Sequence, residues 1–403
     1  MAKLTAFFLS LILFFTSFFG AGSGRSVDRS EKIANNEFAR AGYSLAALLA
    51  DNCYDDLKGQ ILGNTDGNGV PYVWPATSFV EAMADAYRLF PGSAKLRQAY
   101  AGALKRGFAR YLTKDEGYAT PTKAQPIAYY NSSAGGRGSF YYDDNAWVCI
   151  QLLFGYQNLG DRSLLAAAKD NLEFIWSGWD DALGGGIYWS SGFTSKNTCS
   201  NAPSAIAFLL AYQITGDEMY LDRGRQIYDW TNRTLRRNDL FDDCIALNGN
   251  VDRWNGAYNQ ATMIYAGSLL YEITGDGTYY DLTKATVAAT IPLMFKETQT
   301  ETGERKVTMN LNPIFKAWCI GWLVRSYVKF YETDPEKDDT ALNMCIAVMR
   351  DELTTKDENG LYDPYFCSGG ADPANYKDLL QQCGAAAAML NTAYYDAVLN
   401  PEE

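Results

Sequence analysis

Hydrophobic and polar residues follow one another along this chain in a repeated unit. Residues 205–212 are mostly apolar, and after a turn at 213–217 a second segment with charge on one side continues to residue 228. Residues 264–271, the turn 272–276 and the segment after it are a near copy of the same unit. An apolar helix, a short Gly/Asp turn and an amphipathic helix, repeated, predict a fold built from helical hairpins.

Three further turns, less similar to these two, bring the number of predicted hairpins to five. They lie at residues 90–92, 159–161 and 332–335. Two apolar segments, 35–50 and 379–398, have no partner beside them in the sequence. We expect these two to pair across the ends of the chain and to form a sixth hairpin.

The two helices of each predicted hairpin differ in character. The first is apolar on most faces, whereas the second carries charge on one side, as in residues 222–226. A helix that is apolar all round is buried, and an amphipathic helix is peripheral. The pattern therefore predicts an all-α fold, an (α/α)6 toroid with six inner and six outer helices. Strands are expected only at 186–190 and in parts of the long loops.

Loop lengths indicate which face of the toroid carries function. Turns from inner to outer helices are only a few residues long, but the returning connections are about 20 to 30 residues, which is long for helix–helix links. All the long loops must then lie on one face, together with the N-termini of the inner helices. We expect the ligand site there. No Pro-rich, Gly/Ser-rich or single-charge stretch interrupts the chain, so residues 25–403 are expected to form a single domain.

Residues 1–24 have the features of a signal peptide. Lys3 precedes an apolar stretch from 4 to 19, and small residues follow at 20–23. We therefore expect export to the periplasm, the cell surface or the exterior, with no membrane attachment after cleavage. The alternative is a short membrane anchor, although the stretch is shorter than the ~20 apolar residues of a usual span.

The composition of the chain excludes several kinds of partner and of catalytic site. The net charge is −12, which argues against nucleic acid or an anionic membrane as a partner. The chain has no histidine, which excludes Ser/His/Asp and Cys/His nucleophile systems and His-ligated zinc. Eight cysteines show no CxxC spacing; export would permit disulfides among those in loops, while Cys149 and Cys319 lie in apolar runs and are expected to be buried thiols. For the whole chain we expect a monomer that holds neither a metal ion nor a cofactor.

Two adjacent carboxylates, Asp143 and Asp144, stand at the start of the second inner helix. Side chains of adjacent helical residues point about 100° apart, so the two could flank one bond. Glycoside hydrolysis needs two carboxyl groups, one to protonate the departing oxygen and one to attack the sugar or activate water. The alternative is helix capping, because Asp-Asp also occurs at 55–56, 180–181, 242–243 and 338–339.

Other polar and aromatic residues are predicted at the same face. Aromatic rings pack on the apolar faces of sugars, and amides hydrogen-bond sugar hydroxyls; the same residues also serve as core or as helix caps. The Gly-rich segment 184–186 would let backbone approach a ligand. The candidate substrate-binding residues are Trp74, Tyr142, Asn145, Trp147, Tyr188, Trp189, Lys196, Asn197, Tyr258, Asn259, Gln260 and Lys316.

Five motifs together resemble glycoside hydrolase family 76, the endo-α-1,6-mannanases, over essentially the whole chain after residue 24. They are residues 142–147, 184–189, 196–197, 258–260 and 315–316. The resemblance implies an (α/α)6 barrel and an exported, retaining hydrolase that acts on the α-1,6-linked mannose backbone of mannan.

The resemblance also implies roles for the two carboxylates. Asp143 is the expected nucleophile and Asp144 the expected general acid/base, so Asp143 must be ionised while Asp144 holds a proton. A wall-crosslinking fungal branch of the family has a hydrophobic C-terminal tail that this sequence lacks, so a free hydrolase is expected rather than a GPI-anchored transglycosidase. The alternatives are a non-catalytic glycan-binding protein, a transglycosidase, a polysaccharide lyase and an inverting hydrolase.

Overall fold

The computed structural model of the chain describes residues 23–112, 128–131, 140–300, 302–310, 312–313, 317–366 and 376–400, with side chains from residue 29 onward. Most of the predicted signal segment, residues 1–22, lies outside the described residues, as does Lys316.

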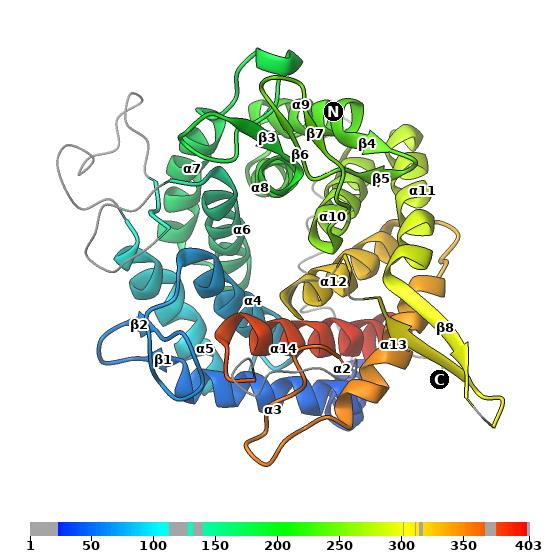
Figure 1. Ribbon diagram of the computed structural model, residues 1–403. Coiled ribbons are helices and arrows are strands. Elements are labelled where there is room, and N and C mark those ends of the chain that lie inside the picture. The colour runs from blue at the N-terminus through cyan, green and yellow to red at the C-terminus, as the bar shows by residue number, and fades with distance from the viewer. Residues whose placement is uncertain are drawn as a thin grey trace.

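Six inner helices form a closed ring. Each packs against the next along the chain, and the last packs against the first (Figure 1). The inner helices are α4 (Val73–Leu89), α6 (Tyr142–Leu159), α8 (Thr198–Thr215), α10 (Ala257–Thr274), α12 (Ala317–Thr333) and α14 (Leu379–Tyr394).

Each inner helix has an outer partner. The outer helices are α3 (Glu37–Asn52), α5 (Ala94–Gly102), α7 (Arg162–Trp176), α9 (Glu218–Leu235), α11 (Gly277–Met294) and α13 (Thr340–Leu353). The predicted pairing across the chain ends is confirmed, because α3 packs against α14. Helix α2 (Ser23–Asn35) precedes α3, the short helices η1 (Ala103–Gly107) and η2 (Phe108–Arg110) extend α5, and η5 (Tyr395–Leu399) follows α14. The (α/α)6 prediction is confirmed.

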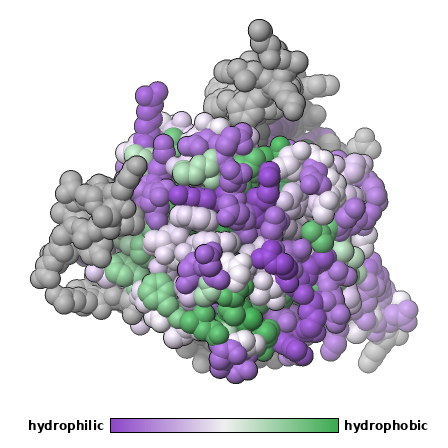
Figure 2. Space-filling model, turned by 90° about the horizontal axis from the view of Figure 1, so that it is seen from above, coloured by the Kyte–Doolittle hydropathy of each residue, from purple (hydrophilic) through white to green (hydrophobic). Residues whose placement is uncertain are grey.

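Burial follows the two layers. Residues 198–211 of α8 and 379–393 of α14 are all buried, as expected for helices enclosed on every side. In α9 the buried residues form one stripe that includes Tyr220, Ile227 and Trp230, while Asp222 is exposed. The side of the molecule in Figure 2 is accordingly mostly hydrophilic, with hydrophobic residues gathered in smaller areas.

Three of the inner-to-outer turns use the same local chemistry. Gly160, Gly216 and Gly275 end their helices in the left-handed region, with φ of 69°, 70° and 69°. The next residue is an Asp whose carboxylate caps the outer helix in each case. Glycine adopts this conformation without strain and Asp is a favoured cap, so two adjacent residues reverse the chain.

An amide at the fourth position of four inner helices fixes the preceding long loop. Each amide oxygen accepts a hydrogen bond from the backbone N–H of one loop residue, and each amide nitrogen donates to the carbonyl of that same residue. We call this arrangement an amide clamp. The pairs are Asn145 with Tyr129, Asn201 with Ile187, Gln260 with Phe241, and Gln382 with Tyr362. The clamps hold the long loops on the face of the inner-helix N-termini.

Strands occur only as short antiparallel pairs in the long loops. A three-stranded sheet, in the order β3 (Ser195–Asn197), β6 (Cys244–Ala246) and β7 (Val251–Asp252), joins two loops. The other pairs are β1 (Tyr54–Asp55) with β2 (Gln60–Ile61), β4 (Arg236–Arg237) with β5 (Leu240–Phe241), and β8 (Phe295–Gln299) with β9 (Arg305–Met309). The β8–β9 hairpin projects from the ring (Figure 1).

The expected strand at 186–190 is wrong. The segment makes isolated bridges to three different parts of the chain: Ile187 to Trp179, Tyr188 to Lys196, and Ser190 to Tyr141. A short 3-10 helix, η3 (Ala182–Gly184), precedes it, and Gly186 has a φ of 90°, outside the range of a regular strand.

Other expectations concern membranes, cysteines and metals. No described helix has the length and hydropathy needed to cross a bilayer. Cys149 and Cys319 are buried, as predicted, and the seven cysteines in the described ranges are all free thiols. In the same ranges, no cluster of three or more acidic or cysteine side chains is arranged to hold a metal ion.

Candidate active site

The paired carboxylates lie where the sequence predicts them. Asp143 and Asp144 are the second and third residues of α6, on the face that carries the long loops. The N-cap of this helix is Tyr141, and it makes no side-chain capping bond. Neither carboxylate therefore serves as the N-cap, unlike Asp161 at the start of α7. Both are partly open to solvent.

The Asp143 carboxylate is held by three donors. Its Oδ1 accepts the backbone N–H of Asp144 at 2.9 Å, and its Oδ2 accepts Nε1–H of Trp189 at 3.0 Å and the Cys199 thiol at 3.6 Å. Burial raises the pKa of Asp143 to about 6, while these hydrogen bonds act in the opposite direction. Three donors and the positive end of a helix favour the ionised form.

The Asp144 carboxyl has a different environment. Burial, and then the neighbouring charge of Asp143, raise its pKa well above its usual range. Within the described residues no hydrogen bond offsets these effects. Two acids side by side in one helix turn thus differ in donors: three donors hold Asp143, whereas burial and the charge of Asp143 both raise the pKa of Asp144.

A third carboxylate, Asp243, lies in the loop before α10, near enough to Cys199 for its charge to raise the pKa of that thiol, and it is not among the predicted site residues. Its Oδ1 accepts Nδ2–H of Asn259 at 3.0 Å. Burial raises its pKa, and hydrogen bonds from Asn259 and then Tyr258 lower it. The Cys199 thiol donates to Asp143, and its pKa is raised by burial and then by the charges of Asp143 and Asp243. The Asp-Asp pair at 242–243, followed by the amides of α10, was the available signal.

Aromatic side chains line the centre of the ring of inner helices. Trp318 of α12 packs against Trp147 at 5.0 Å, Trp74 at 5.2 Å and Tyr258 at 6.0 Å between ring centroids. Trp147 and Trp318 are buried. We call these four residues the aromatic floor. At the rim, Trp189 is 39% exposed and packs against Tyr141. Trp189 therefore presents an open ring beside Asp143.

Four of the predicted substrate-binding residues are buried and bonded to other parts of the protein. Tyr142 is 3% exposed and stacks on Phe174 of α7, outside the ring. Asn145 and Gln260 are buried and fully engaged in amide clamps. Tyr188 is buried and donates its hydroxyl proton to Asp180. Their positions on the long-loop face were predicted, but their side chains bond to or pack against other residues of the same chain.

Lys196 is also a scaffold residue. Its ammonium is fully buried and donates to Asp180 Oδ1 at 2.6 Å and to the carbonyls of Asp180, Ala182 and Gly185 at 3.1, 2.8 and 2.7 Å. Three N–H donors are thereby saturated. Lys196 holds the loop that leads to Trp189, and these acceptors occupy its ammonium.

The remaining candidates lie around the carboxylates. Asn259 is buried and orients Asp243. Asn197 is nearly buried and accepts a hydrogen bond from Ser195. The structure thus places Trp189 and Cys199 against Asp143, and Asn259 and Tyr258 against Asp243. The rest of the aromatic floor packs on Tyr258 through Trp318.

Comparison with known proteins gives the following matches. The sequence model of glycosyl hydrolase family 76 matches residues 38–400. A 121-residue segment is 33% identical to Mannan endo-1,6-alpha-mannosidase DCW1 of Candida glabrata; this covers 27% of the chain and 27% of that relative, so the match spans about a quarter of its length.

Two solved structures share the fold. The GH76 alpha-mannanase BT2949 of Bacteroides thetaiotaomicron has a TM-score of 0.77 and 23% identity, covering 93% of this chain and 100% of its own. An inactive variant of an alpha-1,6-mannanase of Salegentibacter sp., in complex with alpha-1,6-mannotriose, has a TM-score of 0.66 and 22% identity, covering 88% and 100%.

Proposed function

Since the chain belongs to glycosyl hydrolase family 76, we propose that it is an endo-acting, retaining hydrolase of the α-1,6-linked mannose backbone of mannan. The observation that supports this most strongly is the pair Asp143 and Asp144, adjacent in one helix turn yet different in hydrogen-bond donors and in the causes that raise their pKa values. A retaining glycosidase requires an ionised nucleophile and a protonated acid.

The relatives support the substrate. The Candida glabrata protein is a mannan endo-1,6-α-mannosidase. In the Salegentibacter enzyme the inactive variant has two adjacent aspartates replaced by asparagine, and it holds α-1,6-mannotriose. We assign the same substrate class to this chain, with Asp143 and Asp144 as the corresponding pair.

In the first step Asp143 attacks the anomeric carbon of the mannose ring. The bond from that carbon to the bridging oxygen breaks, and the departing chain receives the proton of Asp144. The product of this step is a mannosyl ester on Asp143. The donors from Trp189 and Cys199 keep Asp143 ionised and oriented before attack.

In the second step the ionised Asp144 takes a proton from water, whose oxygen attacks the anomeric carbon. The ester bond breaks, Asp143 regains its charge, and Asp144 regains its proton. Two inversions give overall retention. A sugar hydroxyl that enters in place of water gives transglycosylation.

Other residues are assigned to binding. The open ring of Trp189 offers an apolar face to a sugar next to Asp143. Asp243 and Tyr258 are assigned to hydrogen bonding with sugar hydroxyls. Lys316, which precedes α12 in the sequence, remains a proposed binding residue.

Mannan is a polymer outside the cytoplasm, so the proposal includes export directed by residues 1–24. We assign the protein to the periplasm, cell surface or exterior, acting as a monomer on a polysaccharide.

The test is a product profile on linear α-1,6-mannan, with proton NMR of the first-formed reducing end. The proposal predicts α-1,6-mannooligosaccharides of several lengths, first appearing as the α-anomer. Binding of mannan without cleavage would identify a glycan-binding protein, and a first-formed β-anomer would identify an inverting enzyme.

A further inference from the structure

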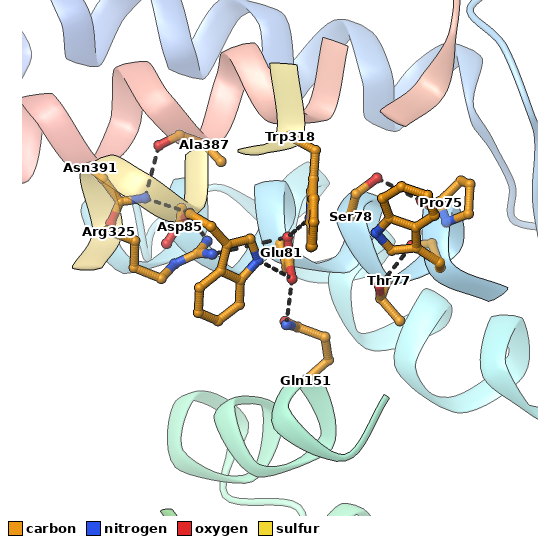
Figure 3. Close-up of polar contacts among 12 residues, drawn as sticks. Pro75, Thr77, Ser78, Glu81, Asp85, Gln151, Trp318, Arg325, Ala387 and Asn391 are labelled. Atoms are coloured by element: carbon orange, nitrogen blue, oxygen red, sulfur yellow. Dashed lines mark hydrogen bonds and ion pairs between the residues drawn. The ribbon is translucent and has the colours of Figure 1, made fainter. Parts of the chain in front are cut away.

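A buried acid that the proposed chemistry does not use, Glu81, lies within the ring (Figure 3). It is 2% exposed and comes from the middle of α4. Its Oε2 accepts Nε1–H of Trp318 at 2.8 Å. Its Oε1 accepts Nε1–H of Trp322 at 3.0 Å and Nε2–H of Gln151 at 3.2 Å. One carboxylate thus joins three inner helices, α4, α6 and α12.

A second buried acid one turn along α4 completes the network. Asp85 accepts hydrogen bonds from Arg325 at 2.5 Å and from Asn391 of α14 at 2.8 Å. The Arg325 guanidinium also lies 4.0 Å from Glu81 Oε2. Glu81 is therefore held by Trp322, Gln151 and Arg325 as well as by Trp318, so its position does not depend on Trp318 alone.

Trp318 connects this network to the catalytic face. It is the second residue of α12, as Asp143 is the second residue of α6, and these two helices stand opposite each other in the ring. Its ring contacts the other three members of the aromatic floor: Trp74, Trp147 and Tyr258. Tyr258 in turn lies near Asp143 and Asp243, whose charges help to raise its pKa after burial.

We infer that Glu81 is a positioning residue for catalysis: it holds the indole of Trp318, and through it the aromatic floor, whose Trp147 lies one turn after Asp143 and Asp144 on α6. This inference rests on the proposed function. An indole has a single donor, so a buried acceptor fixes both its place and its rotation. An error of about 1 Å in such a support can cost on the order of a hundredfold in rate.

The hydrogen bonds to Glu81 favour its ionised form. Three donors converge on its two oxygens, and a protonated carboxyl would turn an O–H toward one of them. Burial raises the pKa of Glu81 to about 7, although Arg325, Trp318 and Trp322 act in the opposite direction. The other titratable groups that face it are Asp85 of its own helix and Cys383 of α14.

The kinetic test compares Glu81→Gln, Trp318→Phe and the double variant on α-1,6-mannan. Gln keeps the shape but places an amide donor against one of the converging N–H groups, and Phe removes the N–H of residue 318. Both single variants are expected to lose kcat on the order of tenfold to a hundredfold, with KM changed less. The double variant is expected to be no worse than the poorer single one, because both break the same link.

Trp322→Phe is the matched control. It removes an N–H from the same carboxylate one helix turn further from the face, and it is expected to keep kcat within about twofold. Losses that simply add in the double variant, or an equal loss in Trp322→Phe, would show that Glu81 has only a structural role.

An activity-independent readout is the indole N–H spectrum of protein labelled with ¹⁵N-tryptophan. The Trp318 signal, identified by its disappearance in Trp318→Phe, is expected to shift and to exchange faster with solvent in Glu81→Gln. An unchanged signal overturns the inference whatever the activity. If the unaltered protein leaves mannan intact, the proposed function fails, and with it the catalytic part of this inference; the spectrum still decides whether Glu81 holds Trp318.

Discussion

The Nε1–H of Trp189 donates to Oδ2 of Asp143 at 3.0 Å, so an indole on a long loop is bonded to an acid at the start of an inner helix. The same loop is held from behind by the buried ammonium of Lys196, which bonds to the backbone of Asp180, Ala182 and Gly185. The reactivity of the helix acid thus depends on the conformation of a loop that the rest of the fold keeps in place.

The first prediction concerns this bond. Trp189→Phe keeps an aromatic ring beside Asp143 but deletes the N–H. A hydrogen bond to a charged group is worth about 1.5–3 kcal/mol, so kcat/KM is expected to fall on the order of tenfold or more, and the acidic limb of the pH profile to move to higher pH. Trp176→Phe, on outer helix α7, is the control. A decrease in kcat/KM without movement of the acidic limb would assign Trp189 to substrate stacking alone.

The second prediction is the pH profile of the unaltered enzyme. Asp143 must be ionised, and its pKa is raised to about 6, so kcat/KM is expected to rise as pH increases through about 6. Asp144 must be protonated, and its pKa is raised well above the usual range, so the basic limb belongs to Asp144. In Asp144→Asn, assayed with a substrate whose leaving group needs no proton, the basic limb is expected to vanish. Persistence of that limb would move the acid role to another residue.

The third prediction concerns stability. A carboxyl whose folded-state pKa is raised binds its proton more tightly in the folded state, so its stabilising contribution is complete below the unfolded pKa and is lost as pH rises through the folded pKa. The raised pKa values of Asp143 and Asp144 thus predict a cost at pH 8. Asp144→Asn is expected to have a higher Tm than the unaltered protein at pH 8 and a smaller difference at pH 4. A lower Tm at pH 8 would contradict the assigned direction.

The fourth prediction separates scaffold from substrate contact at Lys196. Lys196→Met leaves four acceptors without the buried ammonium. The free energy of unfolding is expected to fall by about 3 kcal/mol or more, as measured by denaturant titration. Unchanged stability with a raised KM would restore the substrate-binding role that the sequence suggested.

Much of the fold could be predicted because its signals are local. Gly160, Gly216 and Gly275 each end a helix and precede a capping Asp, and two residues suffice to specify such a turn. The alternation of apolar and amphipathic helices then determines which layer each helix joins.

The direction of a side chain at the site could not be predicted in the same way. Asn145 and Gln260 stand at the expected helix ends, but their amides clamp Tyr129 and Phe241. Whether an amide faces the groove or a loop depends on how that loop folds back. Asp243 was missed for the same reason, since the pairing of β6 with β3 brings its loop to the start of α8, where its charge acts on Cys199.

The central claim is that Asp143 is the nucleophile and Asp144 the acid/base, and chemical rescue by azide tests it most directly. Each residue is replaced by Ala and assayed on an aryl α-mannooligosaccharide with azide present. In Asp144→Ala, azide is expected to attack the mannosyl ester on Asp143 and give the α-mannosyl azide. In Asp143→Ala, azide is expected to take the place of the missing carboxylate and give the β-mannosyl azide. The reverse assignment of anomers, or rescue of neither variant, would contradict the account.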